Sequence, residues 1–191
     1  MADTGAPHFI PYVEPTDLVR DYPAADEAQA LAIAAGLTAA GNAGIGSNVV
    51  STTKTDPFTT TSTSVTDVTN LKVDITPTSA ASKILVIVSI ALDGEGEDFR
   101  AAGVTVARDG TNLATPASGS PSFAGVGQTR PLRAANSQTF HVLDEPNTAS
   151  EITYQVRAQT NSDLLTLFVN RNRQDVSFRY NSTITAIEVA G

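Results

Sequence analysis

The chain has 191 residues, of which 41% are hydrophobic, and a formal net charge of −8. This length suffices for one well-packed domain with an appendage, but hardly for two full domains. Because cysteine is absent, disulfides, thiolate chemistry and zinc sites with sulfur ligands are excluded. No apolar run is long enough to cross a bilayer, and the N-terminus has no signal-peptide pattern. We therefore expect synthesis in a cytoplasm and no membrane partner.

The charge is unevenly placed along the chain. Residues 1–36 carry six acidic residues against Arg20 alone, which gives −5, and the remaining 155 residues carry 14 acids and 11 bases, which gives −3. Nucleic acid is a poor partner for such a chain, because phosphate binding rests on clustered Lys and Arg. The acidic N-terminal segment could meet a basic groove on a partner protein or simply provide solubility.

Proline punctuates the first 23 residues, which prevents a long helix and favours an extended or polyproline conformation. Apolar and aromatic residues lie between the prolines, whereas a disordered tail is usually poor in them. We therefore predict an extended docking arm over residues 1–23 that lies on a neighbouring protein, with its own domain as the alternative surface. The predicted docking residues are Phe9, Ile10, Pro11, Tyr12, Val13, Pro15, Leu18 and Tyr22.

Residues 24–48 predict a short helix followed by a glycine-rich linker. Pro23 precedes the helix, and Asp26 and Glu27 fall in its first turn, where the helix dipole favours acids. Four apolar residues spaced 3, 4 and 3 apart indicate a coiled-coil seam of only about two heptads. This seam predicts a helix that gathers several chains, and packing on its own domain is the alternative. The seam residues are Ala30, Ile33, Leu37 and Ala40.

From residue 49 onward the sequence is that of a β domain. Apolar and polar residues alternate over 71–76 and 151–158, which is typical of half-buried strands. The run 84–88 is apolar on both faces, so it predicts a central strand or one at a subunit interface. The fold class is therefore mainly β, an antiparallel jelly-roll sandwich over residues 49–191, preceded by an extended arm and one short helix. Further strands are expected near 49–55, 58–68, 101–108, 138–143, 164–169 and 183–189.

Two clusters are candidates for binding, and both are expected on loops at the ends of the sandwich. In the first, carboxylates on a glycine-rich turn could hold calcium, although the spacing differs from an EF-hand and a solvated loop is the alternative. In the second, arginines and aromatics could bind a saccharide or an anionic polymer by stacking and forked hydrogen bonds, or form an intersubunit contact. The first cluster is Asp93, Glu95, Glu97 and Asp98, and the second is Arg171, Arg173, Phe178, Arg179 and Tyr180.

The sequence suggests no catalytic residues. Of its two histidines, His8 lies in the arm and His141 on a predicted strand, where a lone histidine is more often structural or exposed than catalytic. There is no G-x-S-x-G motif of a serine hydrolase. Neighbouring acids on one loop would not be held on opposite sides of a sugar, as glycoside hydrolysis requires. We therefore expect no enzyme and no cofactor other than the candidate calcium ion.

Several segments resemble a module common in structural proteins of tailed bacteriophages, namely 66–86, 108–111, 144–148, 153–156 and 181–189. The arm over 10–23 is similar to the start of minor tail proteins of phages that infect actinobacteria. The resemblance implies a trimeric jelly roll of the tumour-necrosis-factor type, found at fibre tips and on virion surfaces. No long fibre shaft separates arm and knob here, which favours a short knob.

The leading interpretation is therefore a virion structural protein made in the host cytoplasm and exposed on the particle surface. Its arm would dock to another virion protein, its helix would gather three identical chains, and its β knob would attach to the host surface from the tail, with a surface saccharide as candidate ligand. The close alternative is a capsid decoration or head-fibre protein. A carbohydrate-active enzyme is a third hypothesis, and the lack of an acid–base pair on rigid strands argues against it.

Overall fold

The computed structural model describes residues 27–36, 48–96, 101–113, 126–128, 136–173, 177 and 179–190. The chain divides into two compact units, 1–47 and 48–191.

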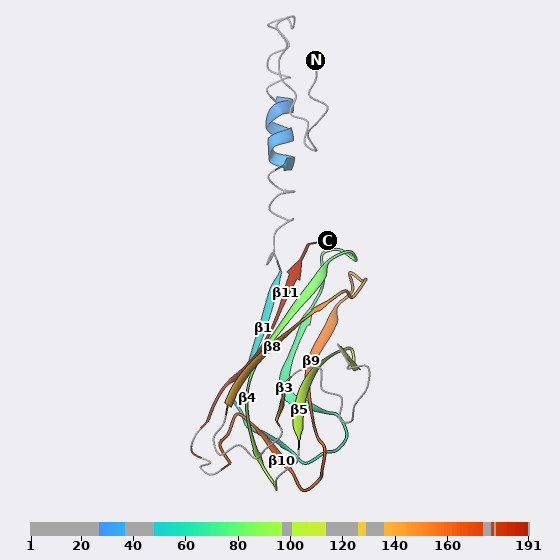
Figure 1. Ribbon diagram of the computed structural model, residues 1–191. Coiled ribbons are helices and arrows are strands. Elements are labelled where there is room, and N and C mark those ends of the chain that lie inside the picture. Colours follow the sequence, from blue (N-terminus) through green and yellow to red (C-terminus); the bar gives the residue numbers. More distant parts are fainter. Residues whose placement is uncertain are drawn as a thin grey trace, which may run out of the picture. The chain divides into compact units, whose positions relative to one another are not determined.

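In the first unit, residues 27–36 form a helix (Figure 1). The predicted seam residues Ala30 and Ile33 lie on this helix and are exposed. Leu37 and Ala40 lie outside the described residues, as does the whole predicted arm over 1–23. No helix within the described ranges is both long and apolar enough to cross a membrane.

The described part of the second unit is built from strands. They are β1 (Val49–Lys54), β2 (Phe58–Thr60), β3 (Thr66–Ile75), β4 (Lys83–Glu95), β5 (Ala102–Arg108), β6 (Thr111–Asn112), β7 (Val126–Gln128), β8 (Asn136–Asp144), β9 (Ile152–Thr160), β10 (Thr166–Val169) and β11 (Ser182–Val189).

These strands form two antiparallel sheets (Figure 1). In sheet A, β4 pairs with β8 on one edge and with both β10 and β11 on the other, and β2 and β1 lie outside these two. In sheet B, β9 lies between β3 and β5, and β5 pairs on its other side with β6 and β7. The pairs are nested along the chain, β1 with β11, β3 with β9, β4 with β8 and β5 with β7, which is the winding of a jelly roll. The predicted mainly-β antiparallel sandwich is confirmed.

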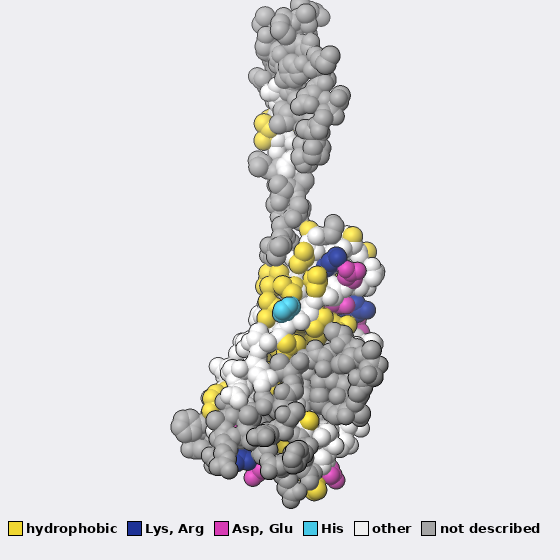
Figure 2. All heavy atoms as spheres, in the orientation of Figure 1, with side chains coloured by type: hydrophobic (Ala, Val, Ile, Leu, Met, Phe, Trp, Pro, Cys, Tyr) yellow, Lys and Arg dark blue, Asp and Glu magenta, His cyan; other side chains and the backbone are white. Residues whose placement is uncertain are grey.

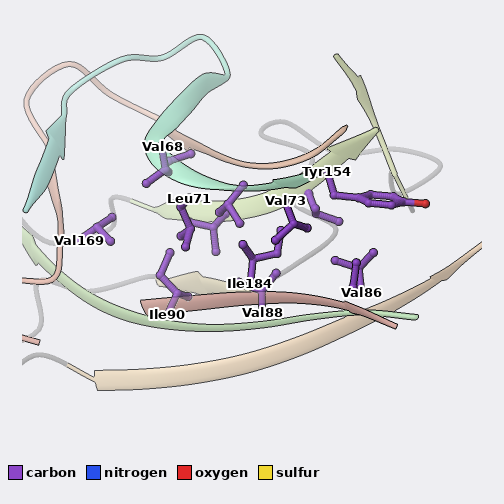
Figure 3. Packing of buried hydrophobic residues seen from close by; sticks show 14 of the residues in the cluster. Val68, Leu71, Val73, Val86, Val88, Ile90, Tyr154, Val169 and Ile184 are labelled. Atoms are coloured by element: carbon purple, nitrogen blue, oxygen red, sulfur yellow. The ribbon is translucent and has the colours of Figure 1, made fainter. Parts of the chain in front are cut away.

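Hydrophobic side chains from both sheets fill the space between them. Along β4 the inward residues Ile84, Val86, Val88 and Ile90 are fully buried, and the intervening residues of the run face outward. Figure 3 shows Val68, Leu71 and Val73 of β3 packed toward residues of sheet A such as Val88, Ile90 and Ile184. Because β4 lies between β8 and β11, the prediction that the apolar run is a central strand is also confirmed.

The predicted strand over 58–68 is wrong in its middle, because 61–65 separates β2 from β3. Hydroxyl groups in and next to this segment form hydrogen bonds with nearby backbone N–H groups, which would otherwise be available to pair with a neighbouring strand. Thr60 Oγ1 accepts from the Ser62 N–H at 3.0 Å, and Ser62 Oγ accepts from the Ser64 N–H at 3.1 Å. Such local bonds compete with sheet pairing, so a Ser/Thr-rich segment can turn where its β propensity predicts extension.

Candidate functional site

The arginine-rich loop connects β10 to β11 of sheet A. Val169, the last residue of β10, lies opposite Leu92 of β4, and Thr183 of β11 lies opposite Ser89 on the same edge. β10 and β11 therefore continue along one edge of β4, and we call their connection, residues 170–181, the excursion; its residues 174–176 and 178 lie outside the described residues.

Asn170 anchors the start of this excursion. Its side chain is fully buried, and its Nδ2 donates to the Lys54 carbonyl at 2.8 Å while its Oδ1 accepts from Ser182 Oγ at 2.6 Å. Its backbone N–H donates to the Ala91 carbonyl at 3.1 Å, and its carbonyl accepts from the Tyr180 N–H at 3.2 Å. Its φ of 61° is in the left-handed region, which asparagine tolerates better than most residues. Asn170 thus ties both ends of the excursion to β1 through its buried side chain and to β4 through its backbone.

Beyond Asn170, two of the predicted ligand residues meet directly. Arg171 and Arg179 form an isolated antiparallel bridge. The Arg171 guanidinium lies 4.4 Å from the centroid of the Phe168 ring, a cation–π contact. Phe168 faces outward from sheet A yet is only 5% exposed. The structure therefore brings together Arg171 and Arg179, with Tyr180 adjacent, whereas Phe178 lies outside the described residues.

Asp93 is not on an exposed turn, which corrects the prediction for the acidic cluster. β4 continues to Glu95, and Asp93 is 1% exposed. Its Oδ1 accepts from the Gly94 N–H at 2.7 Å and its Oδ2 from the Arg173 N–H at 2.9 Å, so the excursion covers it. Glu97 and Asp98 lie outside the described residues. Within the described residues, no group of three or more His, Asp or Glu side chains is placed to hold a metal ion. Calcium binding stays a prediction.

A buried cation next to this loop has its own partner. The Lys54 side chain is 0% exposed, and its Nζ donates to Asp56 Oδ2 at 2.6 Å. This hydrogen bond is the main reason that the pKa of Asp56 lies below its usual value. Asp56 is therefore the ion-pair partner of the buried Lys54.

The outer face of sheet A carries an apolar row that crosses four of its six strands, β1, β11, β4 and β8, at one level. Val49 lies opposite Ile187, Ile187 opposite Leu85, and Leu85 opposite Leu143. We call these four residues the outer row. Val49 is 51% exposed and Leu143 54% exposed, although both are large hydrophobic residues.

The outer row continues onto its neighbours on the same face. Ile87 lies two positions from Leu85, opposite the exposed His141. A group of hydrophobic side chains beside a histidine is visible on the surface in Figure 2. Sequence reasoning anticipated this surface only through the run 84–88, because Val49 and Leu143 reach it from strands that the fold alone brings together. His141 thus lies at the margin of an apolar surface.

No known protein family matches the sequence, and no curated protein matches it. Among solved structures, the chain is similar to that of infectious bursal disease virus Gx strain, with 16% identity and a TM-score of 0.38 over 74% of this chain and 38% of that one. It is also similar to the T=1 particles derived from the same virus, with 13% identity and a TM-score of 0.38 over 75% and 36% of the two chains. This chain therefore spans little more than a third of those chains, and similarity at this level assigns no function.

Proposed function

We propose that this protein is a structural component of a virus particle, a phage tail knob that assembles as a homotrimer through the outer face of sheet A. The observation that carries the proposal is the outer row. A folded domain that exposes a contiguous apolar surface across a rigid sheet has the surface of an assembly unit.

Self-association suits this surface better than a small ligand does. A sheet offers a broad, nearly flat array of side chains, and the four residues of the outer row carry no polar group at their tips. Identical chains related by a closed rotational symmetry would bury the same row three times. The resemblance of the β segments to trimeric jelly rolls of phage structural proteins supports three copies rather than two.

The arm and the knob have separate roles in this proposal. Residues 1–23 dock to another virion protein, residues 24–48 carry the helix and linker, and residues 49–191 form the exposed knob. The knob would contact the host surface, and no catalytic step is assigned to it. The second candidate, a capsid decoration or head-fibre protein, uses the same arm on capsid subunits, and the shortness of the chain between arm and knob suits a short knob at either location.

Reconstitution with particles tests the proposal. Particles that lack this protein are incubated with the full chain or with a chain from which residues 1–23 are deleted, and bound protein is located by electron cryomicroscopy. We expect the full chain on the tail and no binding of the truncated chain, which should still fold because β1 begins at Val49. Density on the capsid would favour the decoration protein. A full chain that binds neither head nor tail would refute both.

A further inference from the structure

The pairing of Arg171 with Arg179 sets two like charges against each other. Residues that lie directly opposite in an antiparallel bridge project from the same face, with Cβ atoms about 5 Å apart. Like charges in this arrangement destabilise the pair. Arg171 and Arg179 form such a bridge. Two positively charged residues at opposed backbone positions are therefore a candidate site for an anion that would compensate both charges.

One of these guanidinium groups is already oriented. Arg171 stacks on the Phe168 ring at 4.4 Å, and Phe168 is itself packed into the outer face of sheet A. Asn170, the residue that precedes Arg171, is fixed by the buried hydrogen bonds of its side chain. A side chain that is held before a ligand arrives loses less conformational freedom on binding. The Arg171 guanidinium is thus preorganised.

Two arginines of this loop also hold unused donors. The Nε atoms of Arg171 and Arg173 are buried and make no hydrogen bond. The Nε of Arg157 is also buried, but it lies 2.8 Å from Asp67 Oδ1, which balances its charge. Among the described residues, no carboxylate lies that close to Nε of Arg171 or Arg173. Both oxygens of the buried Asp93 already accept backbone N–H groups. Buried donors without partners are expected where an ion or ligand binds.

We propose that Arg171, Arg173 and Arg179 form a binding site for an oxyanion carried by a polymer of the host surface. Guanidinium groups match phosphate and carboxylate oxygens through paired, charge-assisted hydrogen bonds. Phe168 and Tyr180 add aromatic surface on which the chain of such a polymer can rest. Only the origin of the polymer rests on the proposed function, because binding itself is a property of the isolated protein.

Calorimetric titration of the full-length protein tests this site. The probes are polyphosphate for phosphate oxygens, polygalacturonate for carboxylates, inorganic phosphate for a free ion and dextran for a neutral polymer. The test variant is Arg171→Gln with Arg179→Gln. The control is Lys72→Gln with Lys83→Gln, which makes the same change in net charge at two exposed lysines that pair with acids elsewhere.

We expect at least one anionic polymer to bind, dextran not to bind, and the arginine variant to bind about tenfold more weakly or worse, as the loss of charge-assisted hydrogen bonds implies. The lysine variant should differ less than about twofold from the natural sequence, because exposed ion pairs contribute little. Equal weakening in both variants, binding to neither polymer, or inorganic phosphate binding as tightly as the polymers (an adventitious ion only) would overturn the site.

A second readout separates binding from structure. Because Arg179 opposes a like charge, Arg179→Gln alone should leave the unfolding midpoint without ligand unchanged or raise it. A clear fall would show that Arg179 supports the fold, and the proposed role would be wrong. If the protein reconstitutes onto particles but binds no anionic polymer, the proposed function stands and this site alone is refuted.

Discussion

Tyr154 donates its hydroxyl hydrogen to Asp144 Oδ2 at 2.7 Å and so joins β9 of sheet B to the end of β8 in sheet A. Arg108, which lies opposite Tyr154 on β5, places its Nη1 at 3.0 and 2.8 Å from the two oxygens of the same carboxylate. Figure 3 shows the Tyr154 ring at one end of the hydrophobic cluster. One carboxylate from sheet A thus pairs with two donors from sheet B, and together they tie the two layers.

Tyr154→Phe should lower the free energy of unfolding by about 1–2 kcal/mol at neutral pH, because Asp144 loses a buried donor. Burial, together with the bond to Asp144, raises the pKa of Tyr154 above its usual 10.0. Its contribution is therefore complete below pH 10 and is lost as the pH rises further, and this alkaline loss should be smaller in the variant. Urea unfolding at several pH values measures both effects. Glu145→Gln is the control, because this neighbouring carboxylate is exposed; a Phe variant as stable as the natural protein would contradict the prediction.

Glu188→Gln should change how the stability of the protein depends on pH at the acidic end of the range. Burial alone would raise the pKa of Glu188, but hydrogen bonds from Ser82, Thr78 and Asn48 together hold it below its usual 4.5. Thr78 alone donates twice to Oε1, from its N–H at 2.7 Å and its Oγ1 at 2.6 Å.

The contribution of Glu188 is therefore complete above pH 4.5 and is lost as the pH falls through its lowered folded pKa. At neutral pH the Gln variant should lose about 1–3 kcal/mol, because an amide faces donors that a carboxylate satisfied. Thermal unfolding between pH 3 and pH 7 measures this. Parallel curves for the variant and the natural protein would show that Glu188 is not the group that titrates.

The fold class could be predicted because its signals are local. Alternation of buried and half-buried residues along β9, from Ile152 to Thr160, follows from side chains that point to opposite faces of a strand. The apolar run in β4 likewise predicted a central strand, and its outward residues Leu85 and Ile87 lie on the outer face of sheet A.

Contacts between distant segments could not be predicted in this way. Asp93 belongs to a glycine-rich acidic stretch, yet it is buried because the N–H of Arg173, 80 residues away, reaches its carboxylate. The bridge between Arg171 and Arg179 depends on how two segments of the backbone pair, and the outer row depends on the register of four strands. Register is set by packing over the whole sheet. The sequence pattern therefore identified the two arginines as candidate binding residues but could not predict that Arg171 lies opposite Arg179.

Asn170 should be worth more to stability than its exposed counterpart Asn147. Both adopt a left-handed conformation, with φ of 61° and 54°, so Ala at either position meets the same backbone strain. Only Asn170 is buried, and its side chain bonds to Lys54 and Ser182, whereas Asn147 Nδ2 makes one bond to the Glu145 carbonyl.

We expect Asn170→Ala to cost about 2–3 kcal/mol more than Asn147→Ala in urea unfolding, from the buried groups left without partners. Asn170→Gly should recover up to about 1 kcal/mol of this, because glycine accepts the positive φ without strain. Equal losses at the two positions would mean that the Asn170 bonds do not hold the excursion.

Charge in the outer row should dissociate the proposed trimer. Leu143→Glu places a carboxylate beside Leu85 on the surface that three chains would bury, and it removes about 2 kcal/mol of hydrophobic burial per chain. Leu143 is 54% exposed in the single chain, so the variant should fold normally. Leu164→Glu is the matched control, because Leu164 is 68% exposed and lies outside the outer row.

Light scattering at micromolar concentration should therefore give the mass of three chains for the natural protein and for Leu164→Glu, and a lower mass for Leu143→Glu. Circular dichroism should show the same β content in all three, so that a change of mass reports on assembly alone. If the natural protein is a folded monomer, the trimer is wrong. If both Glu variants remain trimeric, the chains associate through another surface, and the proposed assembly through the outer row is wrong.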